Sequence, residues 1–583
     1  MAKKTRRSSL VSNTLRRKGK KPNADAMPQR DLLQTNRLNV SKIKRRYVVV
    51  ALIGIFILSF FLNSSALEWG QTGDVSWSPD AIDGRITAIY LPYMYKQWAH
   101  KYPRGQFFVS SFFYNPKIQQ WEKEPVTIQM PDGRIARTPL NQKRLYELAT
   151  ISRKLSLFMS MGILLAVFLT ARKLFDDGLA GLLSCLVLAL SCHFVFYGKS
   201  ACVDIPAFFW FAWAACFGLY AIKTDRLIYY LAAGFCASWS VCTKEGVATF
   251  HIGLAAALAV LLIHAEMKAG KPFKKAILSL LNWKIIAGVV LAALLFITMQ
   301  NMWNSLDEWR YRSQFWKGVI EGEFRSQGVR FIGLLERTYR GLYSGWGGPF
   351  IVVLLPISLC YWLFKYRWQF CLMIYPLLSF FFLTVLVIGQ NLPRFMMCAY
   401  AGIAIIMGKT LADWYRYKKI PAAVRGFLPL IILVPSFICC VCFNAEMKND
   451  TRKRAEQWMR DNAKSQAIVG LSMTRQYAPR VWLDDFSSIP EWDSKGIATL
   501  QGKIVVWPDY IIGSNQWPCM SQNDADFFGS MFRDETNYEK QAEFSRIYFH
   551  QRNFIWKYCL RFFELHPWIS PRMLIYKKTT PQD

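Results

Sequence analysis

Apolar residues in this chain gather into long runs separated by short polar stretches. A window of roughly twenty residues, the length that a helix needs to cross a bilayer, finds about eleven such runs. They lie approximately at 47–63, 154–172, 178–197, 203–222, 227–243, 246–264, 284–302, 347–364, 369–388, 395–412 and 421–443. The pattern predicts a mainly α polytopic membrane protein with about eleven transmembrane helices.

Lysine and arginine residues mark one side of these segments. They are frequent in residues 1–46 and recur after every second apolar segment. The recurring clusters are Arg172–Lys173, Lys223 with Arg226, Lys268–Lys275, Lys365 with Arg367, and Arg416–Lys419. Cytoplasmic loops carry this excess of basic residues. We therefore expect an integral multi-pass protein of the plasma (inner) membrane whose N-terminus is cytoplasmic.

The same alternation divides the chain into three parts. Residues 1–46 are expected to be a basic, disordered cytoplasmic tail, and the first apolar segment is expected to be a retained anchor rather than a cleaved signal peptide. Residues 47–444 form the transmembrane domain, which includes an outer loop at 64–153. Residues 445–583 are expected to form a small extracytoplasmic α/β domain, because they have enough apolar residues for a core of their own.

Local patterns predict structure outside the membrane as well. In the outer loop, amphipathic interfacial helices are expected at 83–102 and 141–152, and a Pro-Asp-Gly turn predicts a hairpin near 126–135. In the tail, residues 452–462 suit a helix. Strands are expected at 467–471, 503–507 and 573–577.

Composition agrees with a membrane protein and restricts the partners. Hydrophobic residues make up 53% of the chain and aromatic residues 15%, which excludes an ordinary soluble globular protein. The formal net charge of +33 follows the topology, so the expected partners are anionic membrane lipids and not nucleic acid. The sequence contains no P-loop glycine motif, which argues against direct ATP-driven pumping.

Two carboxylates follow the first apolar segment, in the stretch Ser76–Arg85 of sequence SWSPDAIDGR. A carboxylate at a membrane surface can take the proton of an acceptor hydroxyl. Asp80 is therefore the candidate general base, and Asp83 is a second candidate catalytic residue. The alternative for Asp83 is that it only caps the helix that follows it.

Further motifs follow in a characteristic order. They are Pro79-Asp80-Ala81, Arg153 at the start of the second apolar segment, Asp204-Ile205-Pro206, Thr243-Lys244 after a glycine-containing segment, and Pro393-Arg394-Phe395. This order resembles the GT-C glycosyltransferases, in particular the family 39-like group of protein O-mannosyltransferases and aminoarabinose transferases. The resemblance covers most of residues 47–415. It departs at Ala81, where relatives often carry Glu, so the base is either Asp80 alone or shared with Asp83.

The resemblance implies the GT-C fold and a polyprenyl-phosphate-linked sugar as donor. Direct displacement by an acceptor hydroxyl or amine needs one base, and cations that stabilise the departing phosphate. The candidates for phosphate contact are Arg153, Lys199, Lys244 and Arg394. Asp204 and Glu245 could orient these cations or bind sugar hydroxyls. This scheme requires no nucleotide, no metal and no other cofactor.

Other interpretations of the same residues stay open. The basic side chains could be interfacial anchors, and Asp204 could be a helix cap. A transporter or flippase of lipid-linked saccharides would also carry charges among its helices, and a non-catalytic scaffold is a third class. Convergence of the charges at one outward-facing site would favour the transferase, whose acceptor could be a lipid, a glycan or a protein.

Overall fold

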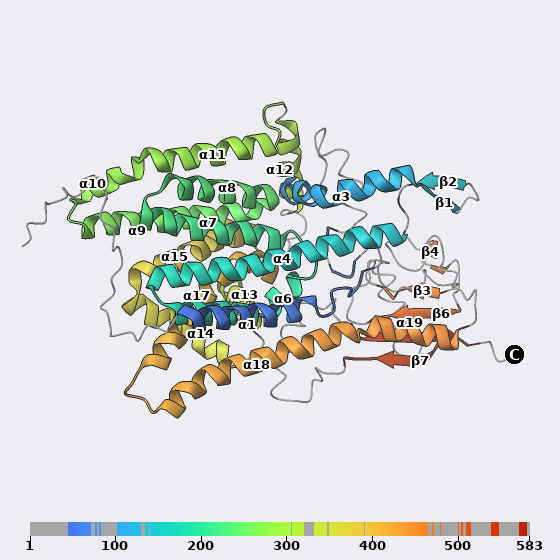
Figure 1. Cartoon of the computed structure of the whole chain (residues 1–583). Coiled ribbons are helices and arrows are strands. Elements are labelled where there is room, and N and C mark those ends of the chain that lie inside the picture. The colour runs from blue at the N-terminus through green and yellow to red at the C-terminus, as the bar shows by residue number, and fades with distance from the viewer. Residues whose placement is uncertain are drawn as a thin grey trace, which may run out of the picture.

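A computed structural model of the chain (Figure 1) describes residues 45–71, 76–78, 81–82, 102–129, 135–138, 140, 142–304, 306–319, 331–346, 349–389, 391–463, 469–471, 478–479, 499–500, 503–504, 509–514, 538–546 and 571–579. Its helices are α1 (Arg45–Ser64), α3 (Gly105–Lys123), α4 (Gln142–Phe175), α5 (Gly178–Ala189), α6 (Cys192–Tyr197), α7 (Asp204–Thr224), α8 (Leu227–Thr243), α9 (Ala248–Lys268), α10 (Phe273–Leu278), α11 (Trp283–Met299), α12 (Asp307–Val319), α13 (Phe331–Ser344), α14 (Pro349–Lys365), α15 (Arg367–Phe380), α16 (Leu386–Ile388), α17 (Met397–Arg416), α18 (Ala422–Lys448) and α19 (Thr451–Asn462).

Short irregular turns of helix join several of these elements. They are the 3₁₀ turns η2 (Glu245–Val247), η3 (Ser279–Leu281) and η7 (Pro393–Met396), and the π-helical η6 (Phe381–Val385). The strands are β1 (Val126–Gln129), β2 (Ile135–Thr138), β3 (Val469–Leu471), β4 (Thr499–Leu500), β5 (Lys503–Ile504), β6 (Tyr510–Gly513), β7 (Tyr538–Phe544) and β8 (Met573–Lys578).

The helical bundle confirms the predicted fold class. Within the described residues, eight helices are long and apolar enough to cross a membrane, and three shorter apolar helices lie among them. Together they coincide with the apolar segments expected from the sequence. Side chains on the outside of the bundle are apolar as well: Val50 of α1 is 68% exposed and Phe364 of α14 is 83% exposed. Such surfaces suit contact with lipid tails.

Small residues let the helices of the bundle pack closely. A Cβ atom on Gly234 of α8 would lie 2.1 Å from the carbonyl oxygen of Gly288 on α11, so only glycine permits this approach. A Cβ atom on Gly408 of α17 would likewise lie 2.3 Å from the backbone nitrogen of Ser184 on α5. Because lipid tails are as apolar as the helices themselves, close packing of this kind supplies much of the attraction between membrane helices.

Part of the first outer loop follows the prediction. The helix expected at 141–152 is present as the first three turns of the 34-residue α4. The predicted hairpin is present as the antiparallel pair β1–β2. The helix α3 was not predicted, and the helix expected at 83–102 lies outside the described residues. Figure 1 shows α3, the hairpin and the start of α4 at one end of the bundle.

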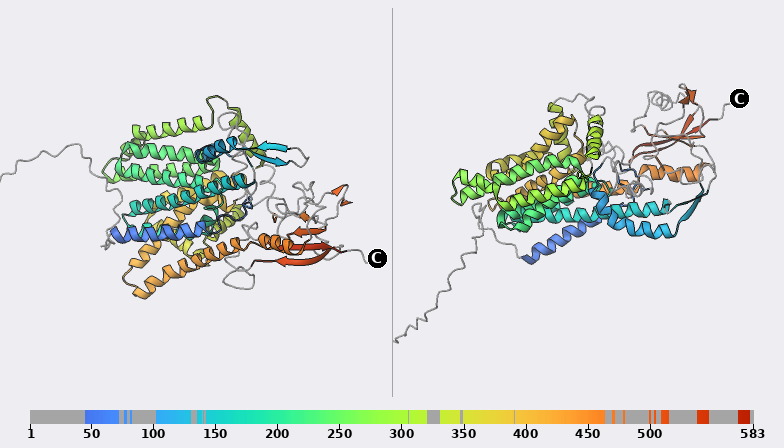
Figure 2. Two further views of the ribbon diagram at one scale, coloured as in Figure 1. Left: turned by 45° about the vertical axis from the view of Figure 1, so that its right-hand side comes forward. Right: turned by 90° about the horizontal axis from the view of Figure 1, so that it is seen from above.

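The C-terminal residues confirm a small mixed domain at that same end. Its sheet has the order β3-β6-β8-β7, in which β3 and β6 are parallel while β8 is antiparallel to both of its neighbours. The helix α19 packs on this sheet, with Ala455 and Met459 buried against Val469, Ile512 and Ile575. Figure 2 shows the domain beside the hairpin end of the bundle.

Candidate functional site

An ion pair joins two spanning helices at the end of the bundle that carries the C-terminal domain. Asp204 begins α7, and Lys244 directly follows α8. The Lys244 ammonium donates a hydrogen bond to the Asp204 carboxylate, and their side chains are 16% and 3% exposed. The positive end of the α7 dipole favours a carboxylate and the negative end of the α8 dipole favours a cation. The antiparallel packing of α7 and α8 therefore brings the two charges together.

A second cation lies beside this pair. The turn η7 places Phe395 so that the Lys244 ammonium lies 5.0 Å from its ring centroid. The Arg394 guanidinium carbon lies 5.3 Å from the same centroid. Pro393 begins the turn and fixes its backbone, and Asn391 donates a hydrogen bond to Thr338 of α13. The structure thus brings together three of the residues predicted from sequence: Asp204, Lys244 and Arg394.

Glu245 forms a neighbouring ion pair with a residue that the sequence did not single out. Arg312 of α12 donates from Nε to the Glu245 carboxylate at 3.0 Å, and its side chain is 1% exposed. The same guanidinium donates to the Gln300 side-chain oxygen. Arg312 Nη1 and Gln300 Nε2 are buried and have no hydrogen-bond partner within the described part of the chain. In the part of the chain that the structure describes, these two hydrogen-bond donors near Glu245 are therefore unused.

The acidic motif of the outer loop is tied to the start of α7. Ala81 forms an antiparallel bridge with Cys202, and the Ile82 N–H donates to the Ala201 carbonyl at 3.1 Å. These contacts lie two to three residues before Asp204. The candidate base Asp80 and its neighbour Asp83 lie outside the described residues, so their roles remain predictions.

Lys199 and Arg153 lie elsewhere, among protein oxygens. The Lys199 ammonium donates to the carbonyls of Leu62 at 2.9 Å and Ser65 at 2.7 Å and to the Asn444 side chain. Lys199 lies in the turn between α6 and α7, outside the spanning helices. Burial lowers the pKa of its ammonium group to about 7. All three donors of the ammonium group are thus used.

Arg153 of α4 holds the beginning of the outer loop. Its guanidinium donates to the carbonyls of Leu67 and Trp69 and to the Ser76 hydroxyl, the last two at 2.7 and 3.1 Å. The side chain is 2% exposed. These contacts tie Arg153 to the backbone and to one serine of the loop that leads to the acidic motif.

Sequence analysis did not predict the roles of Arg312 and Gln300, or that two cations share the ring of Phe395. Arg312 belongs to α12, whose sequence DEWRYRSQFWKGV carries charged residues on several faces, so nothing in it marks one arginine as buried. Gln300 ends α11 as a single polar residue beside an apolar segment. A polar side chain at the end of a spanning helix was the available signal.

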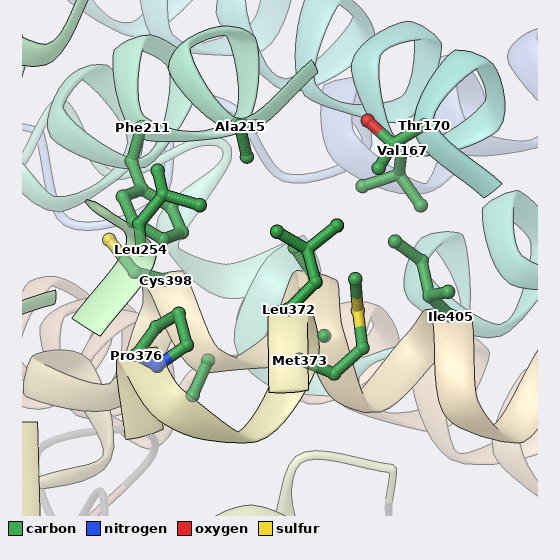
Figure 3. Close-up of a pocket in the computed structure, with 14 residues that line it drawn as sticks. Val167, Thr170, Phe211, Ala215, Leu254, Leu372, Met373, Pro376, Cys398 and Ile405 are labelled. Atoms are coloured by element: carbon green, nitrogen blue, oxygen red, sulfur yellow. The ribbon is translucent and has the colours of Figure 1, made fainter. Parts of the chain in front are cut away.

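A small cavity lies between α4, α7, α9, α15 and α17, and Figure 3 shows it. Apolar side chains such as Phe211, Leu254 and Met373 line it, with the Thr170 hydroxyl at one side. Its volume is about 30 Å³, enough for one water molecule. It is too small for a sugar. Among the described residues, no group of three His, Cys, Asp or Glu side chains is placed to hold a metal ion.

Comparison with known sequences gives no match to a family model or to a curated protein. Comparison with solved structures gives several. ArnT from Cupriavidus metallidurans, in the apo state, matches over 92% of this chain and 99% of its own, with 11% identity and a TM-score of 0.43. An oligosaccharyltransferase from Archaeoglobus fulgidus, in the apo form, matches over 81% of this chain and 70% of its own, with 11% identity and a TM-score of 0.41.

The arabinofuranosyltransferase AftD from Mycobacteria is also similar, over 93% of this chain and 40% of its own, with 11% identity and a TM-score of 0.35. These neighbours are GT-C glycosyltransferases, the class that the order of motifs resembles. ArnT has also been solved with undecaprenyl phosphate bound. At such low identity and TM-score the likeness concerns the fold and carries no argument about function.

Proposed function

We propose that this protein is a membrane glycosyltransferase that moves a sugar from a polyprenyl-phosphate donor to an acceptor on the extracytoplasmic side. The observation that supports this most is the site cluster, defined here as Asp204, Lys244, Glu245, Arg312 and Arg394. Its members come from α7, from the turn between α8 and α9, from α12 and from η7. The Asp204–Lys244 pair, with Arg394 beside it, and the Glu245–Arg312 pair are joined through the adjacent residues Lys244 and Glu245 at one end of an apolar bundle.

The cluster has hydrogen-bond donors available for an anion. Lys244 uses one donor on Asp204 within the described structure, and an ammonium group has three. Arg312 Nη1 is buried without a partner among the described residues. A buried donor without a partner costs free energy, which a phosphate oxygen would recover. We assign donor-phosphate binding to Lys244, Arg312 and Arg394, and sugar hydroxyls to Asp204 and Glu245.

Lys199 and Arg153 have a different part in this proposal. Their donors point to carbonyl, amide and hydroxyl oxygens of the protein, so we assign them to the frame that holds α1, α4 and the outer loop together. A phosphate could bind the Lys199 ammonium only by displacing those contacts. Removing them is therefore expected to affect stability more than donor affinity.

The proposed reaction has a base and a stabilised leaving group. The acceptor hydroxyl attacks the anomeric carbon of the donor sugar, the bond from that carbon to the phosphate oxygen breaks, and the proton passes to the Asp80 carboxylate. Polyprenyl phosphate leaves as an anion held by the cations of the site cluster. Ala81 follows Asp80 directly, and its bridge to Cys202 supports a base close to the start of α7.

The distribution of charge supports a transferase over the alternative transporter or flippase. In α7 the charged residues are Asp204 and Lys223, one near each end. The helix α8 has none, and those of α9 are Glu266 and Lys268 in its last turn. A carrier of charged saccharide lipids would be expected to hold polar groups near the membrane midplane. These three helices are apolar there.

Purified protein and a panel of undecaprenyl-phosphate and dolichyl-phosphate sugars test the proposal. We expect release of polyprenyl phosphate with at least one donor when lipid, glycan and peptide acceptors are supplied. Asp80→Asn keeps the size of the side chain but removes the base, so kcat should fall about a hundredfold or more while donor binding survives.

Asp83→Asn is the matched control for this experiment. Asn caps helices as well as Asp does, so a capping residue should tolerate the change and kcat should fall less than in Asp80→Asn. The reverse ranking would move the base to Asp83. Full activity in the double variant, or no turnover of any donor by the wild-type protein, would contradict the proposed function.

A further inference from the structure

A buried ion pair stands where α18 passes into the C-terminal domain. Arg452 donates from Nε and Nη2 to the two carboxylate oxygens of Asp450, each at 2.8 Å, and both side chains are fully buried. Asp450 also caps α19 by accepting from the Arg452 backbone N–H at 2.9 Å. This bidentate geometry fixes the plane of the guanidinium group.

Two tryptophans of the outer loop pack on this pair. The Arg452 guanidinium carbon lies 3.7 Å from the ring centroid of Trp77 and 5.5 Å from that of Trp69. The Trp69 indole N–H donates to Asp450 at 2.8 Å, and the Trp77 indole N–H donates to the Ala478 carbonyl at 3.1 Å. Stacking on a planar cation and hydrogen bonding at the ring edge fix both rings. Segments about 380 residues apart in the chain thus form one buried contact.

The same stretch of loop is held from the bundle side as well. Arg153 donates to the Trp69 carbonyl and to the Ser76 hydroxyl, which stand at the two ends of the segment 69–76. Beyond Trp77, the Ala81 bridge to Cys202 holds the chain near α7. The loop is therefore fixed at Trp69, Ser76, Trp77 and Ala81, and Asp80 lies in sequence between the last two.

We propose that Arg452 and Asp450 of the C-terminal domain are positioning residues for the acidic loop: by clamping Trp69 and Trp77 they fix the chain before Asp80, while the Ala81 bridge to Cys202 fixes it after Asp80. This inference rests on the proposed function and deepens it, because it gives the C-terminal domain a part in turnover. In this proposal the contact does more than join two domains, because Trp77 stands three positions before the proposed base. Misplacing a catalytic group by about 1 Å can cost about a hundredfold in rate.

Arg452→Lys tests the clamp without an assay of activity. Lysine keeps the charge but loses the planar, two-pronged contact with Asp450 and the stacking on Trp77. Hydrogen exchange followed by mass spectrometry reports on the Trp77 N–H, which donates to the Gly70 carbonyl, and on the Ile82 N–H. We expect exchange of the peptide that contains them to be about tenfold faster than in the wild-type protein.

The second arm of the experiment is turnover of the donor that the wild-type protein uses. A positioning role predicts that kcat falls about tenfold while KM for the donor changes less than twofold. Arg460→Lys is the matched control, since it makes the same substitution at an exposed position of the same helix. It should change neither exchange nor kcat.

Trp77→Phe covers the case in which Arg452→Lys does not fold. It keeps an aromatic face for Arg452 but removes the N–H that donates to Ala478, so a smaller change in the same direction is expected in both measurements. Unchanged exchange in a folded variant would overturn the clamp, and faster exchange with unchanged kcat would overturn its part in turnover. A wild-type protein without transferase activity would overturn the proposed function instead, whatever the exchange result.

Discussion

The two ends of the helical bundle each carry a group of buried and partly buried charges, and the groups differ in how far their hydrogen bonds are satisfied. At the end opposite the site cluster, Asp177 accepts from both terminal nitrogens of Arg416, from Lys409 and from two backbone N–H groups that begin α5. Asp413 accepts from Lys409 and from two tyrosine hydroxyls. We call Asp177, Lys409, Asp413 and Arg416 the opposite cluster.

The site cluster is less complete. Within the described residues, Asp204 accepts one side-chain hydrogen bond, from Lys244, and Glu245 accepts from Arg312 alone. Lys244 and Arg394 lie against the face of Phe395, and within the described residues Lys244 uses one of its three donors, on Asp204. A satisfied network rigidifies a fold, whereas an incomplete one is a place where a ligand can bind. The difference fits a structural role for the opposite cluster and the ligand-binding role that we propose for the site cluster.

The largest effect on stability is expected from the opposite cluster. Asp177→Ala removes a helix cap and the carboxylate that both terminal nitrogens of Arg416 bind, while Lys409 keeps its contact with Asp413. Breaking a buried pair by removing one partner costs about 3–5 kcal/mol, so the unfolding temperature of the detergent-solubilised protein should fall sharply. Affinity of the remaining folded protein for undecaprenyl phosphate should be unchanged. A loss of affinity would contradict the division between the two clusters.

A smaller effect, on ligand affinity, is expected at the site cluster. Lys244→Met removes a cation that we assign to the donor phosphate, so binding of undecaprenyl phosphate should weaken about tenfold, equivalent to about 1.4 kcal/mol. Lys244→Arg should do less harm because it keeps the charge. Lys409→Met is the matched control from the opposite cluster and should leave affinity unchanged. Equal affinity in the Lys244→Met and wild-type proteins would mean that Lys244 is an interfacial anchor and not a phosphate ligand.

Lys199 lies at the same end of the bundle as the site cluster, but protein oxygens satisfy its hydrogen bonds, as in the opposite cluster. Its burial makes the stability of the fold depend on pH. Its folded pKa of about 7 is below the unfolded value of 10.5, so the unfolded chain binds more protons between these values. The free energy of unfolding should therefore rise with pH, by about 1 kcal/mol from pH 7 to 8. Lys199→Met should remove this part of the rise in thermal unfolding scans. A rise that is identical in the variant would rule out Lys199 as its source.

The smallest effect is expected from an exposed ion pair that belongs to neither cluster. Arg340 and Glu336 pair on one face of α13, with side chains 51% and 57% exposed. Exposed pairs of this kind contribute about 0–1 kcal/mol. Arg340→Ala should shift the unfolding temperature little and leave donor affinity and turnover unchanged. A large fall in the unfolding temperature would mean that an exposed ion pair can stabilise this fold as much as a buried one.

The spanning helices could be predicted from sequence because apolar length is a local property. The start of α7 at Asp204 and the end of α8 before Lys244 were visible for the same reason. The helix α3 was missed because its sequence lacks a clear apolar stripe and contains Pro116. Both its ends and its packing on α8 depend on contacts that no local pattern encodes.

The partners of the charged residues could not be predicted. Lys199 and Lys244 resemble each other in sequence, each standing at the end of an apolar segment, yet one meets three oxygens and the other meets Asp204 and an aromatic ring. Arg312 was one of several arginines in a polar loop, and Arg452 one of several in a basic helix. Their burial results from tertiary contacts with residues remote in the chain.

The apolar middles of α7, α8 and α9 have a consequence for the membrane potential. Moving one elementary charge across the membrane changes the free energy by about 2.3 kcal/mol for each 100 mV. These helices carry their charged residues near their ends, so the field has no charge within them to move. A reaction confined to the site cluster would run at the same rate in energised and in de-energised vesicles, and its thermodynamic drive would come from the donor alone.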